Sequence, residues 1–181
     1  MAPRTILLMR HAEKPDDPDD PDDPYLSDAG RDRAARLAEF IPAKYGKPDF
    51  VFTAAESEKS MRSCLTMKPL GAAIAVPLDS RTRAKDCRTL ATKLLSVDLY
   101  ASKLVVACWS HDQLPRLAAA LYAPPGDIPD PWDPSVFDLV LQLDYDNDSP
   151  PVVTRVNEPF LTNGCDLCLT AHRRCPERSL S

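Results

Sequence analysis

The fold of this chain is decided by the stretch Arg4-Thr5-Ile6-Leu7-Leu8-Met9-Arg10-His11-Ala12-Glu13. Residues 4–10 form a nearly continuous apolar run, which is typical of a strand that is covered on both faces. The run stops at an arginine beside a histidine. In parallel α/β sheets, ligands bind outside the carboxyl ends of the strands. The stretch therefore predicts a buried first strand that delivers Arg10 and His11 to a ligand-binding edge.

The composition favours one globular domain. The chain has 181 residues, 44% of them hydrophobic, and a net charge of -5. Residues 15–24 repeat Pro-Asp-Asp and hold six aspartates, so 22 basic and 21 acidic residues remain elsewhere, which does not favour nucleic-acid binding. No apolar run is long enough for a membrane span or a secretory signal. We therefore expect no membrane association, a cytoplasmic location, and reduced thiols at Cys64, Cys87 and Cys108.

Hydrophobic periodicity predicts alternating strands and helices. The expected strands are 4–10, 50–52, 72–76 and 103–109, the expected helices are 27–41, 57–70, 89–95 and 114–122, and a β-hairpin follows at 136–143 and 152–156. Ser27 is expected to cap the first helix and Pro42 to end it, and residues 79–85 are expected to form a polar loop. This order predicts a three-layer α/β/α sandwich with a mostly parallel central sheet and a C-terminal β-hairpin. We expect one domain over residues 1–162 and a tail over residues 163–181.

Two of the three histidines, His11 and His111, come directly after predicted strands. If these strands are neighbours in a parallel sheet, both imidazoles reach the same edge. A single histidine would most simply be a structural residue. Two of them at matching strand ends, with Arg10 beside the first, indicate a site that binds and attacks an anionic group.

Four motifs occur along the chain in a fixed order. They are Leu8-Met9-Arg10-His11-Ala12-Glu13, Leu26-Ser27-Asp28-Ala29-Gly30, Arg62-Ser63-Cys64-Leu65-Thr66, and Ser110-His111 after an apolar strand. Together they resemble the motifs of the histidine phosphatase superfamily, in its phosphoglycerate-mutase-like branch. The resemblance covers residues 4 to about 162, because the hairpin and residues 158–161 resemble the closing strands of that family.

The resemblance implies a phosphatase that hydrolyses a phosphomonoester through a phosphohistidine on His11. Covalent transfer divides one difficult displacement into two easier ones. Arg10 and Arg62 would bind the phosphoryl oxygens, since a guanidinium can form two parallel hydrogen bonds to phosphate, and His111 would be a further donor. The arginines and imidazoles would carry the required positive charge, so no metal and no other cofactor is implied.

The acid that protonates the leaving oxygen is the first departure from the family pattern. The family often has a glutamate after the third strand, whereas this chain has only Asp79 and Asp86 between Val76 and Leu95. We favour Asp86, at the entry of the third helix. Its alternative role is to complement the helix dipole, and the substrate itself could also supply the proton route through water. Glu13 would orient the Arg10 loop or pair with Lys14.

Specificity is the second departure. Asp112 stands where the family commonly has glycine, and it would disfavour an anionic substrate unless its side chain points away. The glycine-rich segment of the mutases is missing, which favours a phosphatase over a mutase. Arg81, Arg83 and Lys85 either select an anionic leaving group or form a solvated loop.

Two further segments have alternative interpretations. Residues 15–24 are either a solvated spacer or a gate or cation-binding rim beside the site. Cys165, Cys168, His172 and Cys175 have a spacing that could close a tetrahedral zinc site, but they could equally belong to a poorly ordered terminus.

The sequence leaves alternatives to a phosphatase. One is a catalytically weak phospho-ligand-binding or scaffold protein, and another is a phosphotransferase or mutase that acts on a small metabolite. We expect a small phosphorylated substrate, but the sequence predicts neither its identity nor the oligomeric state.

Overall fold

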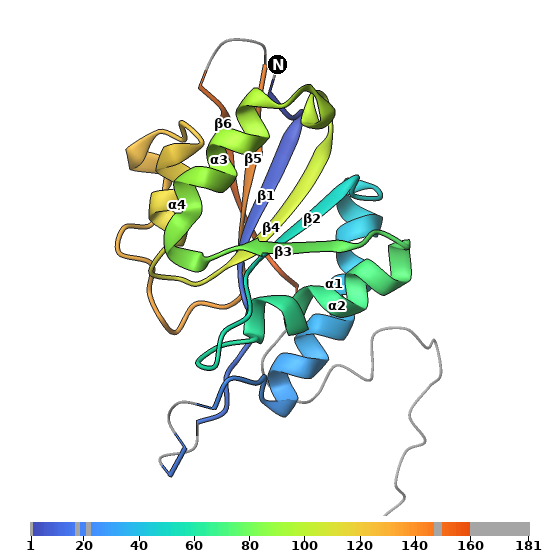
Figure 1. Cartoon of the computed structure of the whole chain (residues 1–181), viewed down its shortest axis with the longest axis vertical. Coiled ribbons are helices and arrows are strands. Elements are labelled where there is room, and N and C mark those ends of the chain that lie inside the picture. Colours follow the sequence, from blue (N-terminus) through green and yellow to red (C-terminus); the bar gives the residue numbers. More distant parts are fainter. Residues whose placement is uncertain (1, 17–18, 21–22, 147–149, 160–181) are drawn as a thin grey trace, which may run out of the picture.

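The computed structural model describes residues 2–16, 19–20, 23–146 and 150–159. Within these residues, six strands form one sheet in the order β3-β2-β4-β1-β5-β6. The first four strands along the chain run parallel to one another, and β5 and β6 form an antiparallel hairpin whose strand β5 pairs antiparallel with β1 (Figure 1). The strands are β1 (Thr5–Arg10), β2 (Phe50–Ala54), β3 (Leu78–Thr82), β4 (Leu104–Trp109), β5 (Leu139–Asp144) and β6 (Val152–Asn157).

Helices cover both faces of the sheet. They are α1 (Asp28–Tyr45), α2 (Arg62–Ile74), α3 (Cys87–Ser96) and α4 (Leu114–Ala120). Side chains of β1 alternate between the two layers: Leu7 and Met9 pack with α1 and α2, and Ile6 and Leu8 pack with α3 and α4. This confirms the predicted three-layer α/β/α architecture with a mostly parallel sheet.

The first helix begins as predicted, but it does not end at Pro42. The hydroxyl of Ser27 accepts a hydrogen bond from the N–H of Gly30, as an N-cap should. Pro42 lies inside α1, which continues to Tyr45 and ends at Gly46, where φ is +87°. The proline costs one backbone hydrogen bond, and buried Ile41 holds the last turn against the sheet.

The strand predicted at 72–76 is wrong. Residues 72–74 continue α2, which starts at Arg62 instead of residue 57 and ends at Ala75 in a left-handed conformation (φ 54°). The third strand lies in the segment that was expected to be a polar loop. Because β3 is at the edge of the sheet, its polar residues Asp79 and Arg81 do not have to be buried.

The tail expected over residues 163–181 lies outside the described residues. This includes the candidate zinc ligands Cys165, Cys168, His172 and Cys175. In the part of the chain that the structure describes, no helix is long and apolar enough to cross a membrane. The same part contains no group of three or more His, Cys, Asp or Glu side chains arranged to hold a metal ion.

Candidate active site

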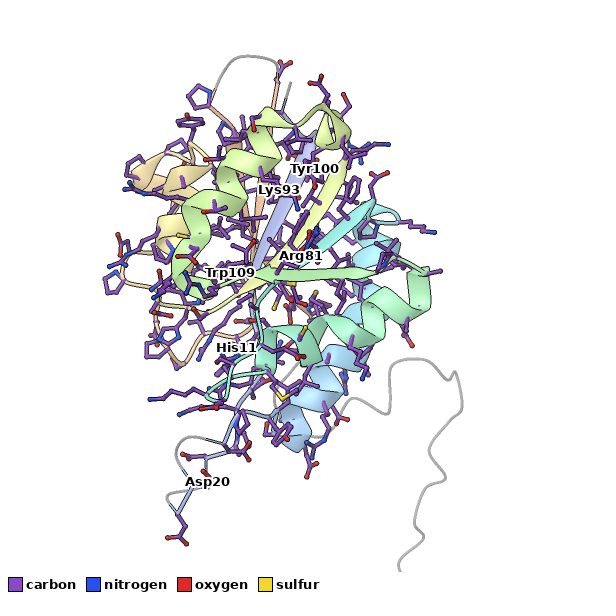
Figure 2. The ribbon with its side chains drawn as sticks, in the orientation of Figure 1. His11, Asp20, Arg81, Lys93, Tyr100 and Trp109 are labelled. Atoms are coloured by element: carbon purple, nitrogen blue, oxygen red, sulfur yellow. The ribbon has the colours of Figure 1, made fainter. Side chains whose placement is uncertain are left out.

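The carboxyl ends of β1 and β4 bring the two predicted histidines to one edge of the sheet. The two strands are parallel neighbours, with Arg10 opposite Trp109. The backbone N–H of His11 donates to the carbonyl of Trp109 over 3.1 Å. His111 follows two residues after Trp109. We call the group formed by Arg10, His11, Arg62 and His111 the histidine site; Figure 2 shows where His11 and Trp109 lie.

His11 is held in one tautomer. Its side chain is buried, and its Nδ1 lies 2.8 Å from the carbonyl oxygen of Ala12. Because a carbonyl can only accept, Nδ1 carries the hydrogen and Nε2 keeps its lone pair. Burial, together with the nearby charges of Arg10, Arg62 and His111, lowers the pKa of His11 to about 4. At neutral pH, His11 is therefore an uncharged imidazole with an available Nε2.

Arg10 is fixed by the loop that leads into β5. Its guanidinium carbon lies 3.7 Å from the ring centroid of Phe137, and Nη1 donates to the carbonyls of Pro134 and Val136. Burial lowers the pKa of Arg10 to about 10, so the side chain stays charged at neutral pH. Its buried Nε has no hydrogen-bond partner among the described residues. This donor is therefore suited to receive an oxygen of an anionic ligand.

Arg62 and Thr66 lie on the first turns of α2. The Nη1 of Arg62 donates to the carbonyl of Asp23 over 2.5 Å, and Nη2 donates to that of Lys59 over 3.2 Å. The hydroxyl of Thr66 accepts from the N–H of Ala12 over 2.9 Å and donates to the carbonyl of Arg62 over 2.7 Å. Thr66 thus connects the start of α2 to the turn that follows His11.

His111 is half-buried on the loop between β4 and α4. Its pKa is lowered by burial and by the charges of Arg10 and Lys14, and it is raised by Asp112. Asp112 is exposed, and its carboxylate accepts a hydrogen bond from the side chain of Gln113 over 2.8 Å. The carboxylate of Asp112 is thus hydrogen-bonded to the next residue of its own loop.

The two candidate proton donors are engaged in ion pairs. Asp79 binds Arg81 over 2.5 Å and Lys93 over 2.8 Å, and these contacts hold its pKa well below the ordinary range. Asp86 accepts from Arg83 over 2.7 Å. The turn that carries Asp86 is anchored at the same end of the sheet as the histidine site, because the indole N–H of Trp109, which lies opposite Arg10, donates to the carbonyl of Ala84 over 2.8 Å. Both aspartates are nevertheless engaged by basic side chains.

Glu13 has a partner that the sequence analysis missed. It pairs neither with Lys14 nor with Arg10 but with Arg33 of α1, at 2.8–3.0 Å. Arg33 is itself buried and also donates to Glu158 over 2.5 Å. We call Glu13, Arg33 and Glu158 the buried charge cluster. A signal for it was present, since Arg33 falls on the same helical stripe as Ala34, Leu37 and Ile41.

The backbone of Glu13 is held as closely as its side chain. Its carbonyl accepts from the N–H of Ser27 over 3.0 Å. A Cβ on Gly30 would lie 2.3 Å from that carbonyl oxygen, so no larger residue fits there. Gly30, the glycine of the second motif, is therefore needed because it lets α1 approach the turn after His11.

The aspartate-proline block leaves the histidine site and returns to it. Figure 2 shows Asp20 at the far end of a segment that projects from the body of the protein. The block rejoins the body where Pro24 accepts from the N–H of Met61 over 3.0 Å, next to the contact between Asp23 and Arg62. Its described tip is solvated, as expected for a spacer, while its end forms part of the wall around Arg62.

Comparisons with known proteins match the fold. No family model matches the sequence, and neither does any curated protein. Among solved structures, mycobacterial glucosyl-3-phosphoglycerate phosphatase with inorganic phosphate is 14% identical (TM-score 0.56, covering 88% of this chain and 98% of that one). The chain has the fold of the histidine phosphatase superfamily. The protein histidine phosphatase SixA complexed with tungstate is 11% identical (TM-score 0.57, 84% and 96% covered). Phosphoglycerate mutase from Plasmodium falciparum is 13% identical (TM-score 0.55, 85% and 90% covered).

Proposed function

We propose that this protein is a phosphatase that hydrolyses a small phosphomonoester through a phosphohistidine on His11. The observation that carries the proposal is the state of His11: Nδ1 donates to the carbonyl of Ala12, the pKa is low, and Nε2 is unprotonated beside Arg10, Arg62 and His111. Structural neighbours that hold phosphate or tungstate, both tetrahedral oxyanions, support the choice of phosphoryl chemistry.

The proposed reaction has two displacements. In the first, Nε2 of His11 bonds to phosphorus while the bond from phosphorus to the ester oxygen breaks, and that oxygen takes up a proton. In the second, water attacks the phosphohistidine, the N–P bond breaks, and Nε2 recovers its lone pair as phosphate and a proton leave. Arg10 and Arg62 neutralise the oxygens of the transferring group, and His111 donates a further hydrogen bond. These residues supply the charge without a metal ion.

The source of the first proton is the open part of the proposal. Asp86 is the side-chain donor that we retain, and its carboxylate forms an ion pair with Arg83. A proton route through water and the substrate is the competing possibility. The variant Asp86→Asn separates the two, since it slows release of the leaving group only if Asp86 donates. Asp79→Asn is the matched control, and we expect it to leave this step unchanged.

Trapping the intermediate tests the proposal. With a ³²P-labelled or chromogenic phosphate ester, the wild-type protein should release phosphate and carry an acid-labile label. His11→Ala should lose both, by about a thousandfold or more in turnover. His111→Ala is the matched histidine control: it should turn over slowly yet still accept the label. Undiminished turnover in His11→Ala would refute the mechanism.

A phospho-ligand binder is the second candidate function. It is favoured by one observation: the carboxylates of Asp79 and Asp86, the two predicted acids, are each engaged by a basic side chain. Tight binding of a phosphate ester by a wild-type protein that acquires no label would support it. A mutase would instead return a rearranged ester, which product analysis detects. The predicted cytoplasmic location stays a prediction.

A further inference from the structure

A cavity of about 890 Å³ lies on the helical layer formed by α3 and α4, apart from the histidine site. Neither His11 nor His111 lines it. The turn at its entrance is fixed to the sheet, because the indole N–H of Trp109 donates to the carbonyl of Ala84 over 2.8 Å. Figure 1 shows α3 and α4 side by side on this face. The lining residues are Lys85, Asp86, Cys87, Arg88, Thr89, Thr92, Arg116, Ala119, Ala120 and Tyr122.

The cavity concentrates positive charge in a protein whose net charge is -5. Lys85, Arg88 and Arg116 line it, and none of them forms an ion pair with another residue of the described chain. Asp86 is the one acid in the lining, and Arg83 already neutralises it. Three cations around one concavity, without an acidic partner, are suited to an anion of more than one charge.

The two arginines converge from different helices. Arg88 is on the first turn of α3 and Arg116 on α4, and both line the same cavity. A guanidinium binds phosphate through two parallel hydrogen bonds. Two guanidinium groups across one cavity therefore match two neighbouring phosphate groups.

The far end of the cavity has a different character. Ala119 and Ala120 present little side chain, and beyond them the ring of Tyr122 is 69% exposed. The backbone of Tyr122 has a φ of 64°, a conformation that side-chain-bearing residues seldom adopt. An exposed tyrosine ring offers a flat surface on which an aromatic ring can stack.

We propose that this cavity is a second ligand site, for a compact oligophosphate with two or more linked phosphate groups. Such a group occurs in nucleoside di- and triphosphates and in short inorganic phosphate chains. If the ligand is a nucleotide, its base would stack on Tyr122. If it is an inorganic phosphate chain, Tyr122 would not contact it. The cavity shares one lining residue, Asp86, with the proposed phosphatase chemistry, but Arg88 and Arg116, which would bind the oligophosphate, take no part in that chemistry.

Calorimetric titration at about 0.15 M salt, where weak surface attraction is largely screened, tests the site. The probes are tripolyphosphate, ATP and inorganic phosphate, and a chelator excludes divalent metals. All proteins carry His11→Ala to prevent turnover. In that background, Arg88→Gln/Arg116→Gln removes the two converging charges from exposed positions. Lys44→Gln/Lys47→Gln removes the same charge from exposed positions on α1 and the segment after it, and it is the matched control.

We expect the arginine pair to contribute about tenfold in affinity for each residue, so the double variant should bind tripolyphosphate and ATP about a hundredfold more weakly. The lysine control and the binding of inorganic phosphate should not change. Tyr122→Ala should weaken ATP alone if the ligand is a nucleotide, and neither probe if it is an inorganic chain. The proposal is overturned if both double variants bind tripolyphosphate equally, or if the background protein binds neither oligophosphate at concentrations on the order of 1 mM.

Discussion

Replacing Arg33 tests the buried charge cluster most directly. Arg33→Met removes four hydrogen bonds and leaves the carboxylate of Glu158, whose side chain is 1% exposed, without its cation. Removing one partner of a buried ion pair costs about 3–5 kcal/mol. We expect a loss of about 3 kcal/mol at pH 7.5, at the lower end of that range, because Glu158 can take up a proton and Glu13 is partly hydrated.

The same helix provides the control. Arg31 is two residues earlier, its side chain is 61% exposed, and its partner Asp28 is 98% exposed. Arg31→Met should therefore change the free energy of unfolding by less than about 1 kcal/mol. Urea denaturation followed by circular dichroism measures both variants, and equal slopes would show that the unfolded states are comparable. If Arg33→Met lies within about 1 kcal/mol of Arg31→Met, the cluster does not stabilise the fold as described.

The cluster also predicts the direction of a pH effect. Burial raises the pKa of Glu158 from its ordinary value near 4.5 to about 7, more than Arg33 and its hydrogen bond lower it. The folded state thus keeps a proton that the unfolded state releases. The resulting stabilisation, about 3 kcal/mol, is complete below pH 4.5 and is lost as the pH rises through 7. Glu158→Gln, which still accepts a hydrogen bond, should flatten this part of the stability curve. An unchanged slope in that variant would contradict the assignment.

Three further predictions concern the turn after the nucleophile. The acid limb of kcat/KM should have its midpoint near pH 4, where His11 loses its proton, and a midpoint above 6 would contradict the buried neutral ring. Gly30→Ala should destabilise the protein by about 2–3 kcal/mol and reduce turnover, because its Cβ would meet the carbonyl of Glu13. Gly126→Ala is the control, since a Cβ there meets open space and should leave stability unchanged. Similar unfolding curves for the two variants would refute this explanation. Thr66→Val should lower the free energy of unfolding by about 1–3 kcal/mol, because it removes the hydroxyl that accepts from the N–H of Ala12. Thr66→Ser keeps this hydroxyl and should lower it less, and chemical denaturation of the two variants tests the difference.

Much of the fold could be predicted from the sequence because the strongest signals are local. The runs that became β1 and β4 are apolar throughout, as strands between two helical layers must be. The edge strand β3 was missed for the opposite reason. Its residues are polar because only part of its surface is covered, while the alanines before it have the high helix propensity that lets α2 continue. Local pattern thus fails where a strand lies at the edge of the sheet.

The residues of the candidate site show the same contrast between local and long-range signals. Arg10, His11 and His111 were predicted because they follow clear strands, and Arg62 because it stands in a family-like motif. Arg33 was missed, although it falls on the apolar stripe of its helix, because no local pattern tells a buried ion pair from a surface charge. Its two carboxylate partners lie 20 and 125 residues away in the sequence. Only the three-dimensional structure shows that they meet.

The positions of the acids bear on the proposed phosphate site in a protein whose net charge is -5. Glu13 is the acid nearest to the nucleophile in sequence, and Arg33 binds its carboxylate on the side of α1. Asp112, next to His111, accepts from Gln113, and the exposed aspartates of the 15–24 block are carried outward on a projecting segment (Figure 2). Glu13 and Asp112 are thus bound by other groups, although Glu13 and Asp133 still act on the charge of Arg10. This arrangement implies that removing Arg33 would affect the histidine site electrostatically as well as the fold, since it would release the carboxylate of Glu13 two residues from His11.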